Sequence, residues 1–197
     1  MICRIEIVRA HINLVSPFRT SFATETDRDL LYVHVVGDDE EGWGECVAMA
    51  APLYSSEYVD GCEEAMKRYL LKMITPTTTA EEFVQKASVI RGNFMAKAAI
   101  EAALLDYQLR KANMSLATFL GATQIKVASG VSVGIQPTID DLLRVVAEYR
   151  ADGYVRIKLK IEPGLDIARV RAVRDAFGED MLLQVDANAA YTVDDAA

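Results

Sequence analysis

The chain has 197 residues, of which 51% are hydrophobic and 25% charged, a composition typical of globular proteins. Its net charge of −8, with no basic tail or stripe, argues against a nucleic-acid partner. No apolar stretch approaches the roughly 18–20 residues of a membrane span, and the opening residues MICRIEIVRAHINLV lack a signal-peptide pattern. We therefore expect a cytoplasmic protein that binds neither nucleic acid nor a membrane.

Cysteine and histidine are too few and too scattered to suggest a zinc site or a disulfide framework. Cys3, Cys46 and Cys62 form no CxxC pair and are expected to be free thiols. His11 and His34 both fall in strand-like segments, where a role as metal ligand is the less favoured interpretation. A bound metal would therefore be held mainly by carboxylates, which favours a hard cation such as magnesium.

The first 125 residues combine strands with helices. Alternating and β-rich runs over about the first 60 residues, with an acidic, glycine-rich turn in DDEEGWGEC, predict an antiparallel sheet. From about residue 60 to 120 the period becomes helical, and Thr79 with Glu82 forms a capping-box pattern. Closely spaced alanines in residues 95–111 would permit tight contact with a neighbouring element. This order predicts an α+β region over residues 1–125.

The pattern changes after residue 125 to alternating strands and helices. Strands are expected to start near residues 127, 154 and 181, so that a βα unit repeats about every 27 residues. Several such units indicate a parallel sheet and a (β/α) barrel. A complete barrel has eight strands and about 250 residues, so residues 126–197 are expected to form its first three βα units, truncated.

The segment YVRIKLKIEPG, residues 154–164, combines an apolar face with a cationic one. Its apolar side chains suit the outer helices, which leaves Arg156, Lys158 and Lys160 pointing into the barrel. Because an isolated buried cation is costly, we expect these side chains to approach the carboxyl end of the strand, where barrel active sites lie. Lys160 is nearest that end. Repulsion between two lysines favours a neutral form of one of them, which can serve as a base.

The next strand, MLLQVDAN, carries Asp186 at its carboxyl end on the face shared with Leu182 and Gln184. Asp186 follows Lys160 by about one βα unit and should lie near it. Lysines beside an inward aspartate suggest a base working next to a metal-held anion. A plain Lys–Asp ion pair lining the barrel mouth is the alternative, and the spacing leaves both open.

Six segments in order carry a resemblance to a known family. They are PFRTSFAT, GWGECVAMAAPLYSSE, MAKAAIEAALLDYQLRKANMSLATFLGA, SGVSVGI, KLKIEPG and LLQVDANAAYT. Together they resemble the enolase superfamily, and within it the muconate-cycloisomerase-like branch that holds o-succinylbenzoate synthases and N-acylamino acid racemases. The resemblance covers essentially the whole chain. It implies an α+β capping domain over residues 1–125 and the start of an enolase-like TIM barrel over residues 126–197.

The resemblance also implies roles for individual residues. Lys160 would be the acid/base on one face of the substrate, and Lys158 its electrostatic neighbour. Asp186 would be the first of three carboxylate ligands to Mg²⁺, with Mn²⁺ as a substitute, and Asn188 a nearby support. Ser132 would contact the substrate carboxylate, with a barrel-filling role as the equal alternative. The capping loops that cover the substrate would include Phe18, Arg19, Thr20, Phe22 and Tyr54, each of which could equally be an ordinary surface-loop residue.

The function that the resemblance implies is Mg²⁺-dependent removal of a proton α to a carboxylate, through an enediolate. We expect an o-succinylbenzoate synthase, a dehydrating enzyme of menaquinone biosynthesis, with N-acylamino acid racemase as a second activity. Dipeptide epimerase and cycloisomerase are alternatives within the superfamily, and a truncated half-barrel that binds a partner is the non-catalytic alternative. The other metal ligands and a second lysine would lie on later strands, so we expect these 197 residues alone to be inactive. The full-length protein is expected to be a homo-oligomer.

Overall fold

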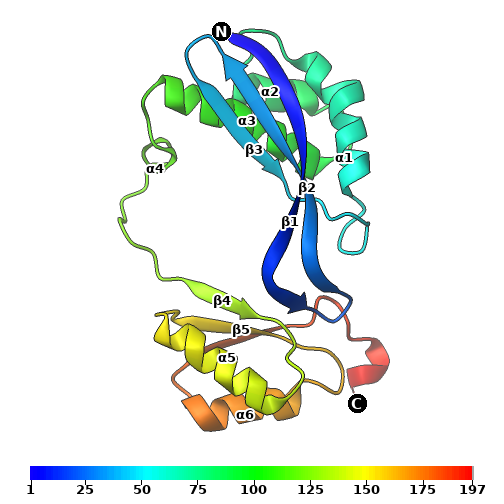
Figure 1. Ribbon diagram of the computed structural model, residues 1–197, viewed down its shortest axis with the longest axis vertical. Helices are drawn as coiled ribbons and strands as arrows, with labels where there is room; N and C mark the ends of the chain where they lie inside the picture. Colours follow the sequence, from blue (N-terminus) through cyan, green and yellow to red (C-terminus); the bar gives the residue numbers. More distant parts are fainter. Residues whose placement is uncertain (197) are drawn as a thin grey trace. The chain divides into compact units, whose positions relative to one another are not determined.

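The computed structural model describes residues 1–196, which form two compact units (Figure 1). The first unit comprises Met1–Asn13 and Asp27–Thr123, and the second comprises Leu14–Thr26 together with the residues from Gln124 onward. Each unit has its own hydrophobic core. The sequence predicts a change of organisation near residue 125, but it does not predict that residues 14–26 belong to the second unit.

A three-stranded sheet supplies one layer of the first unit. Its strands are β1 (Ile2–Arg19), β2 (Thr24–Gly37) and β3 (Glu41–Cys46), in the order β1-β2-β3. β2 and β3 run antiparallel, with Leu31 opposite Cys46 and Val36 opposite Glu41. Leu31, Val33 and Val35 alternate along β2 and are fully buried. This period-two burial directs one face of the sheet into the core.

Helices supply the other layer of the first unit. They are α1 (Val59–Ala65), followed by a π-helical turn (Met66–Leu70) and a 3₁₀ turn (Leu71–Met73), then α2 (Ala80–Ala87), α3 (Phe94–Lys111) and α4 (Leu116–Phe119). The predicted capping box is confirmed: the Glu82 backbone N–H donates to Thr79 Oγ1, and the Thr79 N–H donates to the Glu82 carboxylate, both at 3.1 Å. Two donors at the start of α2 are thus satisfied.

Close packing of α3 on β3 depends on glycines facing alanines. A Cβ atom added to Gly44 would lie 2.0 Å from the Ala99 carbonyl oxygen, and one added to Gly42 would lie 2.3 Å from that of Ala103. Ala99 and Ala103 are fully buried. The tight helix contact predicted from the alanine spacing is therefore confirmed, and β3 supplies the matching surface.

Parallel βα units form the second unit. The strands are β4 (Gly130–Val133), β5 (Arg156–Lys160) and β6 (Leu182–Asp186), in the order β4-β5-β6. The helices are α5 (Ile139–Ala151), α6 (Ile167–Phe177) and a final 3₁₀ turn (Val193–Ala196). Thr138 caps α5 by accepting the Asp141 N–H at 3.0 Å, and α6 ends at Gly178, whose φ is 85°. An α+β unit followed by parallel βα units is the predicted fold class, a capping domain with part of a barrel.

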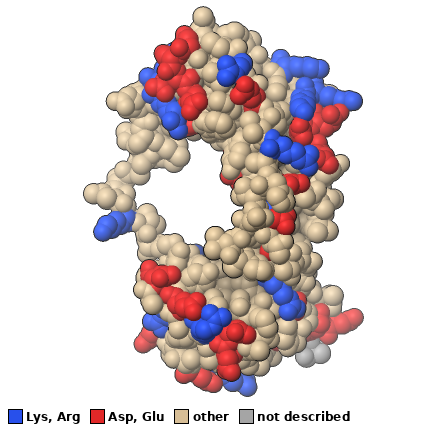
Figure 2. Space-filling view, in the orientation of Figure 1, with Lys and Arg blue, Asp and Glu red and all other residues tan. Residues whose placement is uncertain are grey.

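The face of the molecule seen in Figure 2 carries cations and anions intermixed on both units.

None of the helices within residues 1–196 is long and apolar enough to cross a membrane.

Candidate functional site

Strand β5 separates its apolar and cationic side chains as the sequence predicts. Ile157 and Leu159 are buried against the helices of the second unit, with 0% and 2% of their surface exposed. Lys158 and Lys160 lie on the opposite face, and only 10% of the Lys160 side chain is exposed. A lysine this buried requires a partner.

Asp186 is the partner of both lysines. Lys160 is directly opposite Asp186 in the register of β5 and β6. The ammonium groups of Lys160 and Lys158 lie 2.8 and 2.9 Å from the same carboxylate oxygen. These contacts, with the Lys160 ammonium as the largest cause, hold the pKa of Asp186 well below its ordinary range. The carboxylate also offsets the repulsion between the two cations.

Asn188 completes the surroundings of the Lys160 ammonium. Its side-chain oxygen accepts from Lys160 at 2.6 Å, and its backbone N–H donates to Asp186 Oδ1 at 2.9 Å. Asn188 and Ala189 both have left-handed backbones, with φ of 49° and 61°. Asparagine tolerates this conformation through local hydrogen bonds, whereas alanine adopts it only at an energetic cost. Sequence analysis assigned Asn188 a supporting position, but the turn that creates this position was not foreseen.

Ser132 and Phe18 also belong to the second unit. Ser132 is exposed on β4 and pairs in register with Lys158, so it follows the same face of the sheet. The Phe18 ring lies close to Gly134, because a Cβ atom added to that glycine would be 3.4 Å from a ring carbon. Both residues are thus near the strand ends that carry the lysines.

Thr20 uses its side chain within the loop between β1 and β2. The Thr20 N–H donates to the Ala23 carbonyl at 2.8 Å, and its hydroxyl lies 3.1 Å from the same oxygen. Thr20 is 7% exposed, whereas Phe22 beside it is 37% exposed. Thr20 therefore closes the turn, and Phe22 is the more accessible of the two.

Arg19 was expected in a loop but is the last residue of β1. Arg19 and Ser21, in the loop that follows, attach this segment to the carboxyl ends of all three parallel strands. The Ile135 N–H after β4 donates to the Arg19 carbonyl at 2.9 Å. The Arg19 guanidinium donates to Glu162 after β5 at 2.6 Å. Ser21 Oγ donates to the Ala187 carbonyl after β6 at 2.7 Å. Sequence analysis missed Glu162 and Ser21, since their partners are far away in the chain.

Tyr54 belongs to the first unit, in the turn-rich segment 50–57, and its residue surface is 65% exposed. It is not one of the side chains that the second unit brings together.

The oxygen ligands present suit a hard cation but do not complete a metal site. Asp186 offers a carboxylate, the ligand type that Mg²⁺ prefers. Within residues 1–196, however, no three His, Cys, Asp or Glu side chains are grouped so that they could hold a metal ion. Both histidines lie against carboxylates instead: His11 is 2.8 Å from Asp29, and His34 is 2.8 Å from Glu41. Among the site residues expected from the sequence, Asp186 is the one carboxylate, and it lies in the second unit.

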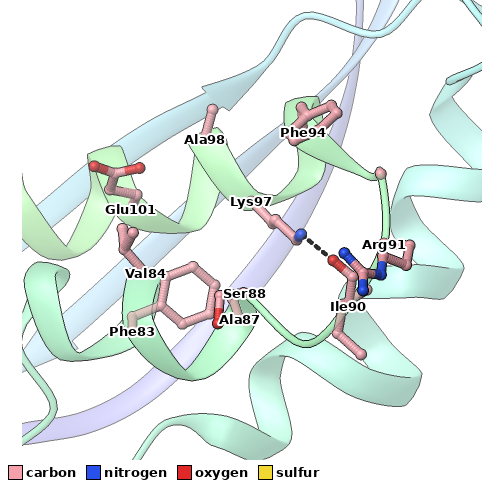
Figure 3. Close-up of a pocket in the computed structure, with 11 residues that line it drawn as sticks. Phe83, Val84, Ala87, Ser88, Ile90, Arg91, Phe94, Lys97, Ala98 and Glu101 are labelled. Carbon is pink, nitrogen blue, oxygen red and sulfur yellow. Dashed lines mark hydrogen bonds between the residues drawn. The ribbon is translucent and has the colours of Figure 1, made fainter.

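A pocket of about 520 Å³ lies in the first unit, along α2 and the start of α3 (Figure 3). Its floor includes Phe83 and Ala87, and Lys97 at its rim donates a hydrogen bond to the Ile90 carbonyl. None of the site residues expected from the sequence lines it.

Two protein families match successive parts of the chain. The N-terminal domain of mandelate racemase / muconate lactonizing enzyme matches residues 3–121, which is more than half of the chain. The chain belongs to this family. The enolase C-terminal domain-like family matches residues 141–197. The resemblance to the enolase superfamily that the sequence motifs predict is therefore confirmed.

Individual relatives within the superfamily are also similar to this chain. N-succinylamino acid racemase of an Amycolatopsis species is 52% identical over 98% of this chain and 53% of its own length. The o-succinylbenzoate synthase of Geobacillus kaustophilus is 43% identical over 94% of this chain and 50% of its own. A dipeptide epimerase structure from Enterococcus faecalis V583, complexed with Mg and L-Leu-L-Tyr, has a TM-score of 0.86 at 27% identity, over 98% of this chain and 55% of that one. The chain spans about half the length of these relatives.

Proposed function

We propose that this chain carries one half of a proton-abstracting site, in which Lys160 removes or returns the proton α to a substrate carboxylate. The observation that carries the proposal is the cluster of Lys160, Lys158, Asp186 and Asn188 at the ends of β5 and β6. Its Lys160 ammonium is largely shielded from water and lies at the end of a barrel strand, where barrel active sites are found.

Lys160 and Lys158 differ in their surroundings, and we assign them different roles. Lys160 has a side chain 10% exposed and touches both Asp186 and Asn188, which fixes the direction of its ammonium group. Lys158 has a side chain 29% exposed, and its ammonium lies 2.9 Å from Asp186. Lys160 is thus the acid/base, and Lys158 adds positive charge that favours the developing enediolate.

Asp186 is assigned to a divalent metal, Mg²⁺ or Mn²⁺, as one carboxylate ligand. Such a metal supplies Lewis-acid stabilisation of the negative charge that develops on the substrate carboxylate. Asp186 also lies within 2.9 Å of both ammonium groups. Asn188 orients the Lys160 ammonium, because it contacts that ammonium directly.

The remaining predicted residues are assigned to substrate binding. Ser132 follows the same sheet face as Lys158 and is exposed, which suits contact with a substrate carboxylate. Phe18 at the end of β1 and Phe22 in the loop that follows provide apolar surface, and Thr20 shapes that loop. Tyr54 is proposed to be a substrate-loop residue because of the motif resemblance alone.

The whole protein is proposed to be an o-succinylbenzoate synthase of menaquinone biosynthesis with N-acylamino acid racemase as a second activity. The names of the relatives that are 43% and 52% identical support this pair of activities. Dipeptide epimerisation is the second candidate, favoured by the similarity to a dipeptide epimerase structure. A cytoplasmic location, a small carboxylate substrate and a homo-oligomer belong to the same proposal.

The test is exchange of the α-proton for deuterium. The intact mass of the purified protein is first compared with the 21.7 kDa of this sequence, to establish which form is assayed. The protein is then incubated in heavy water with Mg²⁺ and N-succinyl amino acids, and α-deuterium is measured by NMR. Lys160→Gln should lower the exchange rate by about 10²- to 10⁴-fold, the usual contribution of a general base.

Lys126→Gln is the matched control, because Lys126 lies in the second unit outside the cluster and is exposed. Its exchange rate should equal that of the parent protein. A Lys160→Gln protein that is folded and exchanges at the parent rate would contradict the proposal. The Lys–Asp contacts would then be a structural ion pair, the alternative that the sequence leaves open.

A further inference from the structure

We propose that Arg19 and Ser21 are positioning residues that hold the Lys160 cluster through the loops after β5 and β6. This inference rests on the proposed function, and it assigns Arg19 to Glu162 rather than to the substrate. Its basis is one polar contact from the loop between β1 and β2 to each of the three strand ends.

The first contact that matters for the cluster is the ion pair of Arg19 with Glu162. Glu162 follows Lys160 by two residues, and 20% of its side chain is exposed. The Leu165 N–H donates to the Glu162 carbonyl at 2.9 Å, with Gly164 at φ 82°, as in a type II turn with proline at the second position. This turn fixes the backbone of Glu162. A fixed backbone limits the positions that the Glu162 carboxylate can take beside Arg19.

The second contact reaches the other side of Lys160. Ser21 donates to the carbonyl of Ala187, which lies between Asp186 and Asn188. Those two residues are the acceptors of the Lys160 ammonium. The loop therefore restrains the segments on both sides of the lysine.

The third contact fixes the loop backbone itself. The Arg19 carbonyl accepts the N–H of Ile135, and a Cβ atom on Gly134 would approach the Arg19 backbone to 3.1 Å. The absence of a side chain at Gly134 permits this close approach. With its carbonyl and its guanidinium both engaged, Arg19 connects the ends of β4 and β5.

Amide hydrogen exchange at Ile135 tests the attachment without relying on activity. The Ile135 N–H is bonded to Arg19 and the residue is 5% exposed, so its exchange reports whether the loop stays docked. Glu162→Gln should speed this exchange by about three- to tenfold. The Ile161 N–H, which donates to the Asp186 carbonyl at 3.0 Å, should exchange at an unchanged rate.

Three further variants distinguish loss of the charge pair from general damage to the fold. Glu179→Gln is the matched control, because the Glu179 side chain is 88% exposed and its carboxylate lies 3.7 Å from Arg174 Nε, a weaker contact than that of Glu162 with Arg19. It should leave Ile135 exchange unchanged. The double variant Arg19→Glu with Glu162→Arg restores opposite charges and should return Ile135 exchange toward the parent rate, whereas Arg19→Glu alone should not.

The positioning role is tested by substrate kinetics of the same variants. Glu162→Gln should lower kcat by about tenfold with KM changed by less than about threefold, because the lysine is displaced while substrate contacts remain.

Unchanged Ile135 exchange in Glu162→Gln, or no restoration in the double variant, would overturn the attachment. If the Ile135 amide exchanges faster in Glu162→Gln but kcat equals that of the parent protein, the positioning role is wrong. A parent protein longer than these 197 residues that shows no α-proton exchange would overturn the proposed function instead, and Ile135 would still decide whether the loop is attached.

Discussion

Asp186 accepts hydrogen bonds from two ammonium groups and from the Asn188 backbone, and its lowered pKa follows from these contacts. Replacing Lys160 with methionine removes the largest contribution. We therefore expect the pKa of Asp186 to rise toward its ordinary range in Lys160→Met, as measured by carbon-13 NMR titration of the carboxyl group. Lys126→Met should leave the titration unchanged, and an unshifted Asp186 in Lys160→Met would show that the ammonium contact is not formed in solution.

The same shift has a defined sign for stability. Because the pKa of Asp186 is lower in the folded protein than in the unfolded chain, its contacts stabilise the fold above the unfolded-state pKa. This contribution is lost as the pH falls toward the folded-state pKa. The free energy of unfolding should therefore decrease less steeply between about pH 5 and pH 2 in Lys160→Met than in the parent. Chemical denaturation at a series of pH values measures this slope.

The helix α3 and the strand β3 approach one another so closely that only glycine fits at the contact. Gly44→Ala would place a methyl group 2.0 Å from the Ala99 carbonyl oxygen, which belongs to backbone and cannot rotate away. We expect the free energy of unfolding of the first unit to fall by about 3 kcal/mol, at the upper end of overpacking effects. Urea denaturation followed by Trp43 fluorescence measures this, since Trp43 is the only tryptophan and neighbours Gly44.

Gly61→Ala provides the contrast, because it is the same chemical change within α1. The nearest atoms to an added Cβ belong to the Tyr58 ring, at 3.0 Å, and a side chain can move. Alanine is favoured over glycine in a helix by up to about 1 kcal/mol, which offsets the adjustment. A loss in Gly61→Ala as large as that in Gly44→Ala would contradict an explanation based on backbone contact.

Elements defined by local patterns could be predicted from the sequence. The alternation of β5, the Thr79–Glu82 box and the βα repeat depend on neighbours within a few residues, and the structure confirms them. Contacts across the chain could not be predicted in this way. Arg19 and Glu162 are 143 residues apart, and Ser21 and Ala187 are 166 apart, so no local period encodes their pairing. The position of Lys160 at its strand end was predictable, whereas the contacts of Arg19 with Glu162 and of Ser21 with Ala187 were not.

The whole chain divides into two units whose buried side chains form separate clusters. One cluster contains Phe83, Ile100 and Leu104, and the other contains Ile157, Leu159 and Val173. The predicted catalytic residues Lys160 and Lys158 and the predicted metal ligand Asp186 all belong to the second unit. A variant that weakens the first core should therefore leave the geometry of the lysine cluster intact, provided that the units unfold separately.

Separate unfolding can be observed with one core substitution in each unit. Phe83→Ala should lower the stability of the first unit by about 3–5 kcal/mol, and Ile157→Ala that of the second by about 2–5 kcal/mol, because both side chains are fully buried. Trp43 belongs to the first unit, so its fluorescence midpoint should shift in Phe83→Ala and stay constant in Ile157→Ala. Circular dichroism, which reports both units, should shift in each variant. Equal shifts of the Trp43 midpoint in the two variants would mean that the units unfold as one cooperative structure, and damage to the first core would then reach Lys160 as well.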